Sequence, residues 1–410
     1  MAYEGPPKDR FHLMFIIIIF QGFATLIAWN MFTIAKAYFV EYKLHGATEM
    51  ASNYLAYVGW ASQLPNLVFS WVNVFIVLKG ALVSRILWML IVEVFLFIFT
   101  IILAMLNSST WPALFFWLTM ISVVVLNSLN AIFQNTTFGI AAPLPPKYIG
   151  GVVLGQNTCG TMIVLLSWIT DELGGSYRTA AIYFFLFGMF VLMLSFDLFL
   201  GLPLNRFYSY YHKAQASKPK TSATPAEAKK IPYGHIFKRA KFQIFILFSI
   251  FFVTLSIYPA VHSDIHPVSP GFLGKNFVRV TCFLTFNFMA MVGNTTASLW
   301  QFPNRRWLIV FAAVRYLFIP FYLFCNYHPL GRTRFLPVLV SSDWVYWIVA
   351  VFMGWSSGHG SSLGMMYIGG TVEPEYASKA GMIGGASIMT GIMVGLLFTR
   401  VCPLIVSSAT

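Results

Sequence analysis

Long apolar runs separated by short polar links occupy almost the whole chain. Each run approaches or exceeds the roughly 20 apolar residues that a helix needs to cross the hydrocarbon core of a membrane. The pattern therefore predicts eleven spanning helices, at 13–39, 54–78, 84–106, 112–141, 149–169, 179–200, 242–261, 277–300, 307–326, 343–368 and 379–402. The fold class expected from this pattern is an all-α integral membrane protein.

One long polar segment, 201–241, separates the first six predicted spans from the last five. It carries nine lysines and arginines against a single acid, Glu227. Basic segments of this kind remain on the cytoplasmic side of a membrane. We therefore expect an N-terminal six-helix bundle at 1–200, a cytoplasmic basic loop at 201–241 and a C-terminal five-helix bundle at 242–410. The N-terminus is then cytoplasmic and the C-terminus lies outside.

A basic run could also be an arm that binds nucleic acid. The apolar flanks favour the membrane interpretation, so no nucleic-acid partner is expected, and the lipid bilayer is the expected surrounding. Composition agrees with this, because 58% of the 410 residues are hydrophobic and 10% are charged, whereas soluble domains have roughly 25% charged residues.

The four cysteines, Cys159, Cys282, Cys325 and Cys402, lie in or beside spans without a repeated spacing. This spacing suggests neither a disulfide framework nor a zinc site. The chain also lacks a recognisable catalytic triad and a glycine-rich phosphate loop. We expect no enzymatic activity, no cofactor and no bound metal.

Polar residues recur at helical spacing within several predicted spans, which places them on one face of each helix. These stripes comprise Gln21, Thr25, Asn30 and Thr33 in span one, Gln63, Asn66, Ser70 and Asn73 in span two, Asn127, Asn130 and Gln134 in span four, and Asn287, Asn294 and Ser298 in span eight. An amide facing lipid has no hydrogen-bond partner there. The stripes therefore either bond neighbouring helices, at about 0.6 kcal/mol per contact, or line a polar cavity.

Ionisable residues within the spans are few, and Glu93, Asp197 and Arg315 are the clearest. Such residues are often functional, although each of these could also have a structural role. His359, between two glycines of span ten, is either a proton-sensitive group or a packing histidine.

Short motifs along nearly the whole chain resemble those of the equilibrative nucleoside transporter family. They are Pro7-Lys8-Asp9-Arg10 with Trp29-Asn30, Leu64-Pro65 with Asn73, Asn127-Ser128 with Gln134 and Phe138-Gly139, Gly155-Gln156, Gly201-Leu202-Pro203, Pro259-Ala260-Val261, Cys282 to Asn287 with Gly293, and Arg315 with Pro320. No single motif carries the resemblance, which depends on their order and number.

The resemblance implies a major-facilitator-like fold of eleven helices in six-plus-five bundles. It also implies facilitated, bidirectional transport of nucleosides by alternating access, and in some members transport of nucleobases or organic cations. Carried over by position, Leu26 and Trp29 would pack against the substrate, Gln134 would bond the base, and Tyr258 would form an aromatic wall. The implied substrate-binding residues are Leu26, Trp29, Gln63, Asn66, Asn130, Gln134, Tyr258, Asn287 and Asn294.

The sequence departs from the family pattern at span eight. The family usually has an acid and an arginine four positions apart, where this chain has Ala290 and Asn294. Asn130 replaces a small residue, Ser357 replaces an asparagine, and His359 replaces a frequent tyrosine. These changes leave the identity of the substrate open, whereas the expected fold is unaffected by them.

Three functions are consistent with the sequence. The first is a sodium-independent nucleoside carrier, expected to be a monomer in the plasma membrane. The second is a carrier of nucleobases or organic cations. The third is a non-transporting membrane receptor or scaffold that retains the fold.

Overall fold

The computed structural model describes residues 7–36, 38–44, 49–76, 82–173, 175–217, 231–329 and 332–407. Within these ranges the regular structure is helical, and only two isolated β-bridges join pairs of loop residues, Ile265 with Tyr327 and Arg334 with Ser407. The predicted all-α fold class is confirmed.

The long helices of the first half follow the predicted spans. They are α1 (Leu13–Ile34), α3 (Tyr54–Phe75), α4 (Leu82–Met105), α5 (Pro112–Ala141), α6 (Pro146–Leu173) and α7 (Tyr177–Gly201). The short elements among them are η1 (Arg10–His12), η2 (Tyr38–Lys43), α2 (Glu49–Ser52) and η3 (Leu202–Leu204).

The second half follows α8 (Arg206–Ser217), a helix within the polar segment. Its main helices are α9 (Tyr233–Ile257), η6 (Arg279–Leu284) with α11 (Thr285–Leu299), α12 (Leu308–Val314), η7 (Arg315–Leu317), α13 (Phe318–Leu323), α14 (Asp343–Ile368) and α15 (Ala377–Thr399). The short elements are α10 (Ala260–Ser263), η5 (Gly274–Asn276), η8 (Gly369–Thr371), η9 (Pro374–Tyr376) and α16 (Cys402–Val406).

Eight helical stretches in the described part of the chain are long and apolar enough to cross a membrane. Helices α3 and α14 are long enough, but their amide, serine, glycine and histidine residues lower their hydropathy. The α12 to α13 segment, Leu308–Leu323, is apolar but shorter. A multi-pass membrane protein is therefore clear, while the count of eleven spans stays a prediction.

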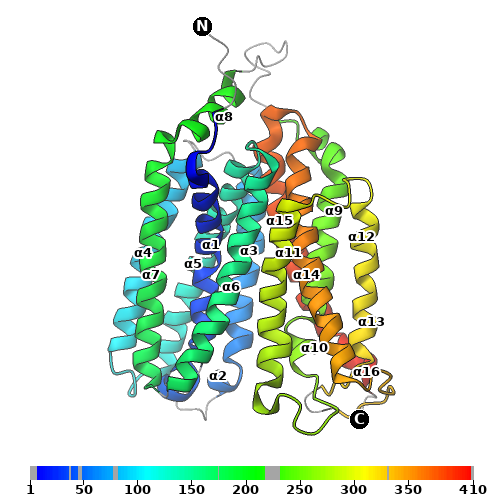
Figure 1. The fold of residues 1–410 in the computed structure, drawn as a ribbon. Helices are drawn as coiled ribbons and strands as arrows, with labels where there is room; N and C mark the ends of the chain where they lie inside the picture. The colour runs from blue at the N-terminus through cyan, green and yellow to red at the C-terminus, as the bar shows by residue number, and fades with distance from the viewer. Residues whose placement is uncertain are drawn as a thin grey trace.

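The helices form two groups that lie side by side in Figure 1, α1 to α7 and α9 to α16. In the first group α1 packs against α6, α3 against α5, and α4 against α7. In the second, α9 packs against α15 and α11 against α14. The groups meet where α6 contacts α11 and α14, and where α15 contacts α3 and α5. Helix α1 begins at the end of the molecule that carries α8, and α16 lies at the opposite end.

Helix α9 begins at Tyr233, earlier than the boundary of 242 predicted from apolar residues alone. Ile236 and Ala240, four residues apart, are fully buried and hold this first part of the helix against the protein. The basic residues Lys238, Arg239 and Lys241 consequently stand on a helix and not in a loop. Residues 218–230 of the predicted loop lie outside the described residues.

Glycine permits the closest helix contacts in both groups. A Cβ atom added at Gly155 of α6 would lie 1.9 Å from the carbonyl oxygen of Ile19 in α1. A Cβ atom added at Gly358 of α14 would likewise lie 1.9 Å from the carbonyl oxygen of Ala290 in α11. Lipid chains are as apolar as leucine, so helices in a membrane associate through close packing of this kind. These contacts fix the α1–α6 and α11–α14 pairs.

Arg315 joins three helices of the second group although it is almost completely buried. Its Nη2 donates to Thr254 Oγ1 of α9 at 2.8 Å. Its Nη1 donates to Ser356 Oγ and, at 3.2 Å, to the Met353 carbonyl of α14. A buried cation needs such acceptors to offset the loss of its hydration. These hydrogen bonds therefore support a structural role for Arg315.

The substitution Gly358→Ala should separate α11 from α14, because the new methyl group would meet backbone atoms that cannot rotate away. We expect the free energy of unfolding to fall by about 1–3 kcal/mol, the usual cost of overpacking. Thermal unfolding of the purified protein in neutral detergent measures this change. Gly59→Ala in α3 is the matched control, since a Cβ atom there meets nothing within 4 Å. Equal stability of the two variants would contradict the close contact.

Candidate functional site

The middle of α1 meets α6 through polar groups. Asn30 Nδ2 donates to the Leu26 carbonyl at 2.8 Å and lies 3.6 Å from Cys159 Sγ of α6. One turn nearer the α8 end, Gln156 Nε2 donates to Thr25 Oγ1 at 3.2 Å. The polar stripe predicted on α1 therefore partly bonds helices together.

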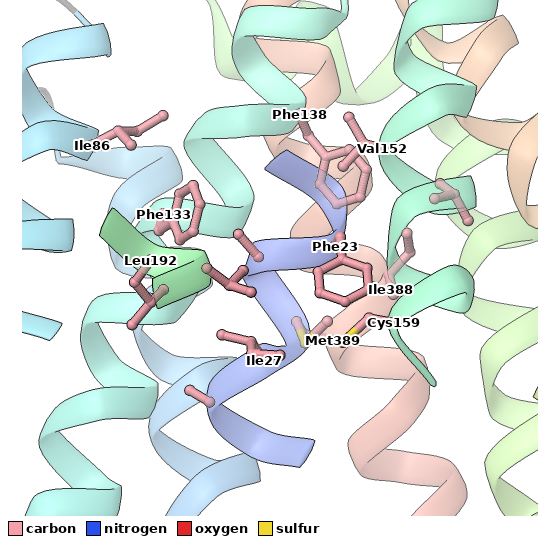
Figure 2. Close-up of a cluster of buried hydrophobic side chains, with 14 of the residues drawn as sticks. Phe23, Ile27, Ile86, Phe133, Phe138, Val152, Cys159, Leu192, Ile388 and Met389 are labelled. Atoms are coloured by element: carbon pink, nitrogen blue, oxygen red, sulfur yellow. The ribbon is translucent and has the colours of Figure 1, made fainter. Parts of the chain in front are cut away.

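An apolar layer joins the two groups beside Asn30. Figure 2 shows Phe23 of α1 and Cys159 of α6 close to Ile388 and Met389 of α15. All four belong to one buried cluster, and none exposes more than 7% of its surface. This layer fills the space between the first and second groups at the level of Cys159.

Tyr258 and Asn287, predicted from different spans, lie together. Asn287 Nδ2 donates to Tyr258 Oη at 3.0 Å and to the Phe283 carbonyl at 2.9 Å. The Tyr258 ring stacks on Phe286 with centroids 3.9 Å apart. A Cβ atom added at Gly160 of α6 would lie 2.3 Å from Asn287 Oδ1, so this carboxamide touches the first group. Since Gly160 follows Cys159, the pair Tyr258–Asn287 lies near Asn30.

The amides of α5 differ in their hydrogen bonds, although the Oδ1 atoms of Asn130 and Asn135 both lack a partner among the described residues. Asn127 Nδ2 donates to the Val123 carbonyl at 2.8 Å, and Asn135 Nδ2 donates to the Ser70 carbonyl at 2.8 Å. Asn130 Oδ1 is buried with no hydrogen-bond partner among the described residues. Gln134 is 3% exposed, and its side chain makes no hydrogen bond to any residue that the structure describes. Asn130 and Gln134, four residues apart, are therefore suited to bond a solute.

The α3 stripe shows the same division. Asn73 Nδ2 donates to Thr136 Oγ1 of α5 at 3.0 Å, and Asn73 Oδ1 accepts from Arg85 Nη1 at 2.7 Å. Asn66 has only a 3.5 Å contact with Ser70 Oγ. Gln63 is half-buried and makes no side-chain hydrogen bond within the described part of the chain. The end of the stripe near Asn73 thus joins helices, while Gln63 and Asn66 retain bonding capacity.

Leu26 and Trp29 are partly buried and pack against the main apolar cluster from α1.

Asn294 is completely buried, and both ends of its carboxamide are hydrogen-bonded. Its Nδ2 donates to the Val153 carbonyl of α6 at 3.1 Å, and its Oδ1 accepts from Ser362 Oγ of α14 at 3.1 Å. Ala290, one turn away, is also buried against α14. In this conformation Asn294 connects α6 to α14.

Hydrogen bonds close the α8 end of the boundary between the groups. The Val74 carbonyl of α3 accepts from Lys379 Nζ of α15 at 2.9 Å and from Tyr233 Oη of α9 at 2.8 Å. Trp71 Nε1 donates to Thr390 Oγ1 of α15 at 3.0 Å. At the opposite end Arg279 lies over Trp168 and Arg400 lies over Trp60, both as cation–π contacts between the groups.

The other ionisable candidates lie apart from these amides or are already bonded. Glu93 of α4 has no exposed surface, and neither carboxyl oxygen has a partner among the described residues. Asp197 is exposed on α7. His359 Nε2 donates to the Phe302 carbonyl at 2.6 Å and its Nδ1 lies 3.0 Å from Thr296 Oγ1, as expected of a packing histidine. No group of three His, Cys, Asp or Glu side chains that could hold a metal occurs in the described ranges.

Sequence reasoning missed Gly160 and Lys379, which both connect the two groups. Gly151 and Gly155 in α6 have the four-residue spacing of small residues that mark close helix contacts, and they face α1. Gly160 lies on another face and contacts α11, so this spacing gives no signal for it. Lys379 precedes a strongly apolar run and looks like an ordinary interfacial lysine. Its bond to Val74 depends on a contact between residues that are distant in the sequence.

Residues 120–403 match the family model described as nucleoside transporter. Equilibrative nucleoside transporter 3 of Rattus norvegicus is 28% identical over 432 residues, which cover 96% of this chain and 90% of that protein. Equilibrative nucleoside transporter 1 of Homo sapiens is 26% identical, covering 97% and 98%.

A solved structure of a bacterial homologue of the iron transporter ferroportin, in an outward-facing state, has a similar fold. Its TM-score is 0.59 at 11% identity, and the match covers 95% of this chain and 92% of that chain. At this identity the likeness concerns the fold alone. The family model covers more than half of the chain and describes transporters, not enzymes. The chain therefore belongs to the nucleoside transporter family.

Proposed function

We propose that this protein carries nucleosides across a membrane by facilitated, sodium-independent and bidirectional transport. The observation that carries the proposal is the pair of uncharged amides, Asn130 and Gln134, buried in a transporter of this family without described partners. A nucleoside is neutral and presents many hydrogen-bond donors and acceptors. Buried amides without partners are suited to such a ligand, because binding would satisfy both.

The proposed site lies at the boundary of the two groups and takes its residues from α1, α3, α5, α11 and the end of α9. Trp29, Leu26 and Tyr258 would contact the flat base. Gln63, Asn66, Asn130, Gln134 and Asn287 would bond its polar edges and the sugar. Asn294, now bonded to Val153, would join the site when that contact opens. Each net hydrogen bond would contribute roughly 0.5–1.5 kcal/mol, which suits binding weak enough for release.

Alternating access would proceed by movement of a six-span bundle, α1 with α3 to α7, against a five-span bundle, α9 to α15. Both the N-terminus and the α8 end would be cytoplasmic, since the basic residues gather there, and the C-terminus would be outside. The bonded α8 end corresponds to a carrier closed toward the cytoplasm. We propose that the protein is a monomer of the plasma membrane.

The alternatives differ in what they require of the site. Nucleobase transport needs the same amides without the sugar contacts. An organic cation favours a carboxylate, and Glu93 has no exposed surface from which to offer one. A non-transporting receptor would bind ligand without moving it. Uptake of labelled nucleosides, nucleobases and a model organic cation into transporter-null cells, with and without a proton gradient, distinguishes all of these.

Uridine uptake should saturate with concentration and should persist when choline replaces sodium. The reason is that the described residues contain no group of three His, Cys, Asp or Glu side chains that could hold a coupling cation. Initial rates of labelled uridine uptake in the two media provide the measurement, with cells lacking the protein as control. Loss of uptake in choline would contradict the proposed mechanism.

Gln134→Ala should raise the apparent KM for uridine by about two- to tenfold, the effect of one net hydrogen bond. The matched control is Asn127→Ala on the same face of α5, because Asn127 bonds only the Val123 carbonyl of its own helix. Uptake is compared at equal surface expression. An unchanged KM for Gln134→Ala, or an equal change in both variants, would show that Gln134 does not contact the substrate.

Lys379→Met should favour opening of the α8 end, since Lys379 Nζ no longer holds the Val74 carbonyl. The readout is the reaction of Ala142→Cys with a thiol reagent applied from the cytoplasmic side, because Ala142 packs against Gly381 at this end. We expect faster labelling in Lys379→Met than in Lys213→Met, an exposed control on α8. The natural cysteines are buried and give a low background. Equal labelling rates would contradict a role for Lys379 in closure.

A further inference from the structure

A hollow of about 850 Å³ opens at the α8 end of the second group, between α9 and the segment leading into α12. It is separate from the proposed substrate site, since α12 lies along the outer edge of the molecule in Figure 1. Its lining combines two cations, two amides and two apolar side chains, namely Arg305, Arg306, Gln243, Asn304, Phe242 and Ile309.

The two arginines have no anionic partner in the described part of the chain. The ion pair between His235 and Glu373, at 3.1 Å, does not involve them. Arg305 and Arg306 are both exposed, and further positive charge comes from Lys238 and Lys241 on the first turns of α9. Guanidinium groups match the geometry of phosphate oxygens through paired hydrogen bonds. The charge of the hollow therefore favours a phosphate-bearing ligand.

Gln243 provides a second, independent indication of a ligand. Its side chain is 1% exposed, and both Oε1 and Nε2 lack a hydrogen-bond partner among the described residues. A buried carboxamide without a partner is costly, and native proteins satisfy nearly all such groups. Because Gln243 lines the hollow, a rotation of its side chain would bring the amide to a ligand with hydroxyl and phosphate oxygens, which could then bond it.

The segment that carries the arginines is anchored to α14. Tyr367 Oη donates to the Gln301 and Pro303 carbonyls at 3.1 and 3.2 Å. His359 donates to the Phe302 carbonyl, and the Asn304 carbonyl accepts the Trp307 N–H at 2.9 Å. The hollow thus has a fixed wall, which lowers the conformational entropy lost when a ligand binds.

Apolar residues in and next to the lining segments are exposed. Phe242 and Phe245 of α9 are 53% and 52% exposed, and Trp307 and Val310 beside α12 are 65% and 47% exposed. Exposed aromatic residues at the end of a membrane span are typical of the level of the lipid headgroups. A ligand that enters here meets cations inside the hollow and apolar side chains beside it. The anionic headgroup and the acyl chains of a phospholipid match these two surroundings.

We propose that this hollow binds the phosphorylated headgroup of an anionic lipid from the membrane leaflet at the α8 end. Arg305 and Arg306 pair with the phosphate, Gln243 and Asn304 bond the remaining polar atoms, and the acyl chains lie along Phe242 and Phe245. Its volume far exceeds that of a free phosphate, so the lipid is the favoured source of the anion. The site is independent of the transported solute.

Full-length protein in phosphatidylcholine nanodiscs provides the test, with a short-chain phosphatidylinositol phosphate as the probe and native mass spectrometry or fluorescence as the readout. The double variant Arg305→Gln/Arg306→Gln should weaken binding by about 30-fold, as expected for two lost cations at an anionic headgroup. The matched control, Arg206→Gln/Lys213→Gln, removes the same charge from exposed positions of α8 and should retain binding. Uptake in neutral lipid should be unchanged in the arginine variant.

Gln243→Leu keeps every charge and serves as the second variant, also where the arginine variant does not fold. It should weaken binding severalfold while thermal unfolding without lipid matches that of the unchanged protein. Three results would overturn the proposal: equal losses in the two double variants, wild-type binding by Gln243→Leu, or equal binding of short-chain phosphatidylcholine. Displacement of the lipid by inorganic phosphate would assign the hollow to a free anion and would also overturn it.

Discussion

Two pairs of helices approach so closely that only glycine fits between their backbones, and the rest of the architecture depends on these pairs. In lipid the hydrophobic effect does little to hold helices together, so contact distance and hydrogen bonding replace it. Gly155 brings α6 against α1, and Gly358 brings α14 against α11. Because α6 also contacts α11 and α14, both pairs share one boundary, where the polar side chains of each group meet.

Along that boundary the same residue type serves two purposes, and hydrogen bonding distinguishes them. Asn73, Asn135 and Asn294 each bond a neighbouring helix and thereby fix the packing. Asn130 and Gln134 have equivalent burial but lack described partners. A carrier needs both kinds of amide. The bonded ones hold the helices in register, and the others supply affinity that ends when the solute leaves.

The sequence was sufficient for the helical character of the chain, because long apolar runs leave few alternatives. It left open whether the polar stripes bond neighbouring helices or line a cavity, and the bond from Asn73 to Thr136 shows helix bonding at one end of the α3 stripe. It did not predict which amides would be satisfied, since Asn127 and Gln134 have the same helical periodicity and differ only in the groups around them. The early start of α9 was missed because lysines and arginines at a helix end extend to water while their stems pack on the protein. The contact of Asn287 with Gly160 joins distant parts of the chain, so local patterns carry no signal for it.

The Val74 carbonyl accepts two hydrogen bonds from the second group, and this affects how the boundary opens at the α8 end. Carbonyl groups in the last turn of a helix have no partner within the helix, and here Lys379 and Tyr233 of the other group supply one. When the groups separate, water must take the place of both donors. Opening at this end therefore takes up water as well as exposing surface, and the equilibrium between the closed and open forms depends on water activity. An impermeant osmolyte that lowers water activity on that side acts on the carrier as an opposing ligand would, although it binds nowhere on the protein.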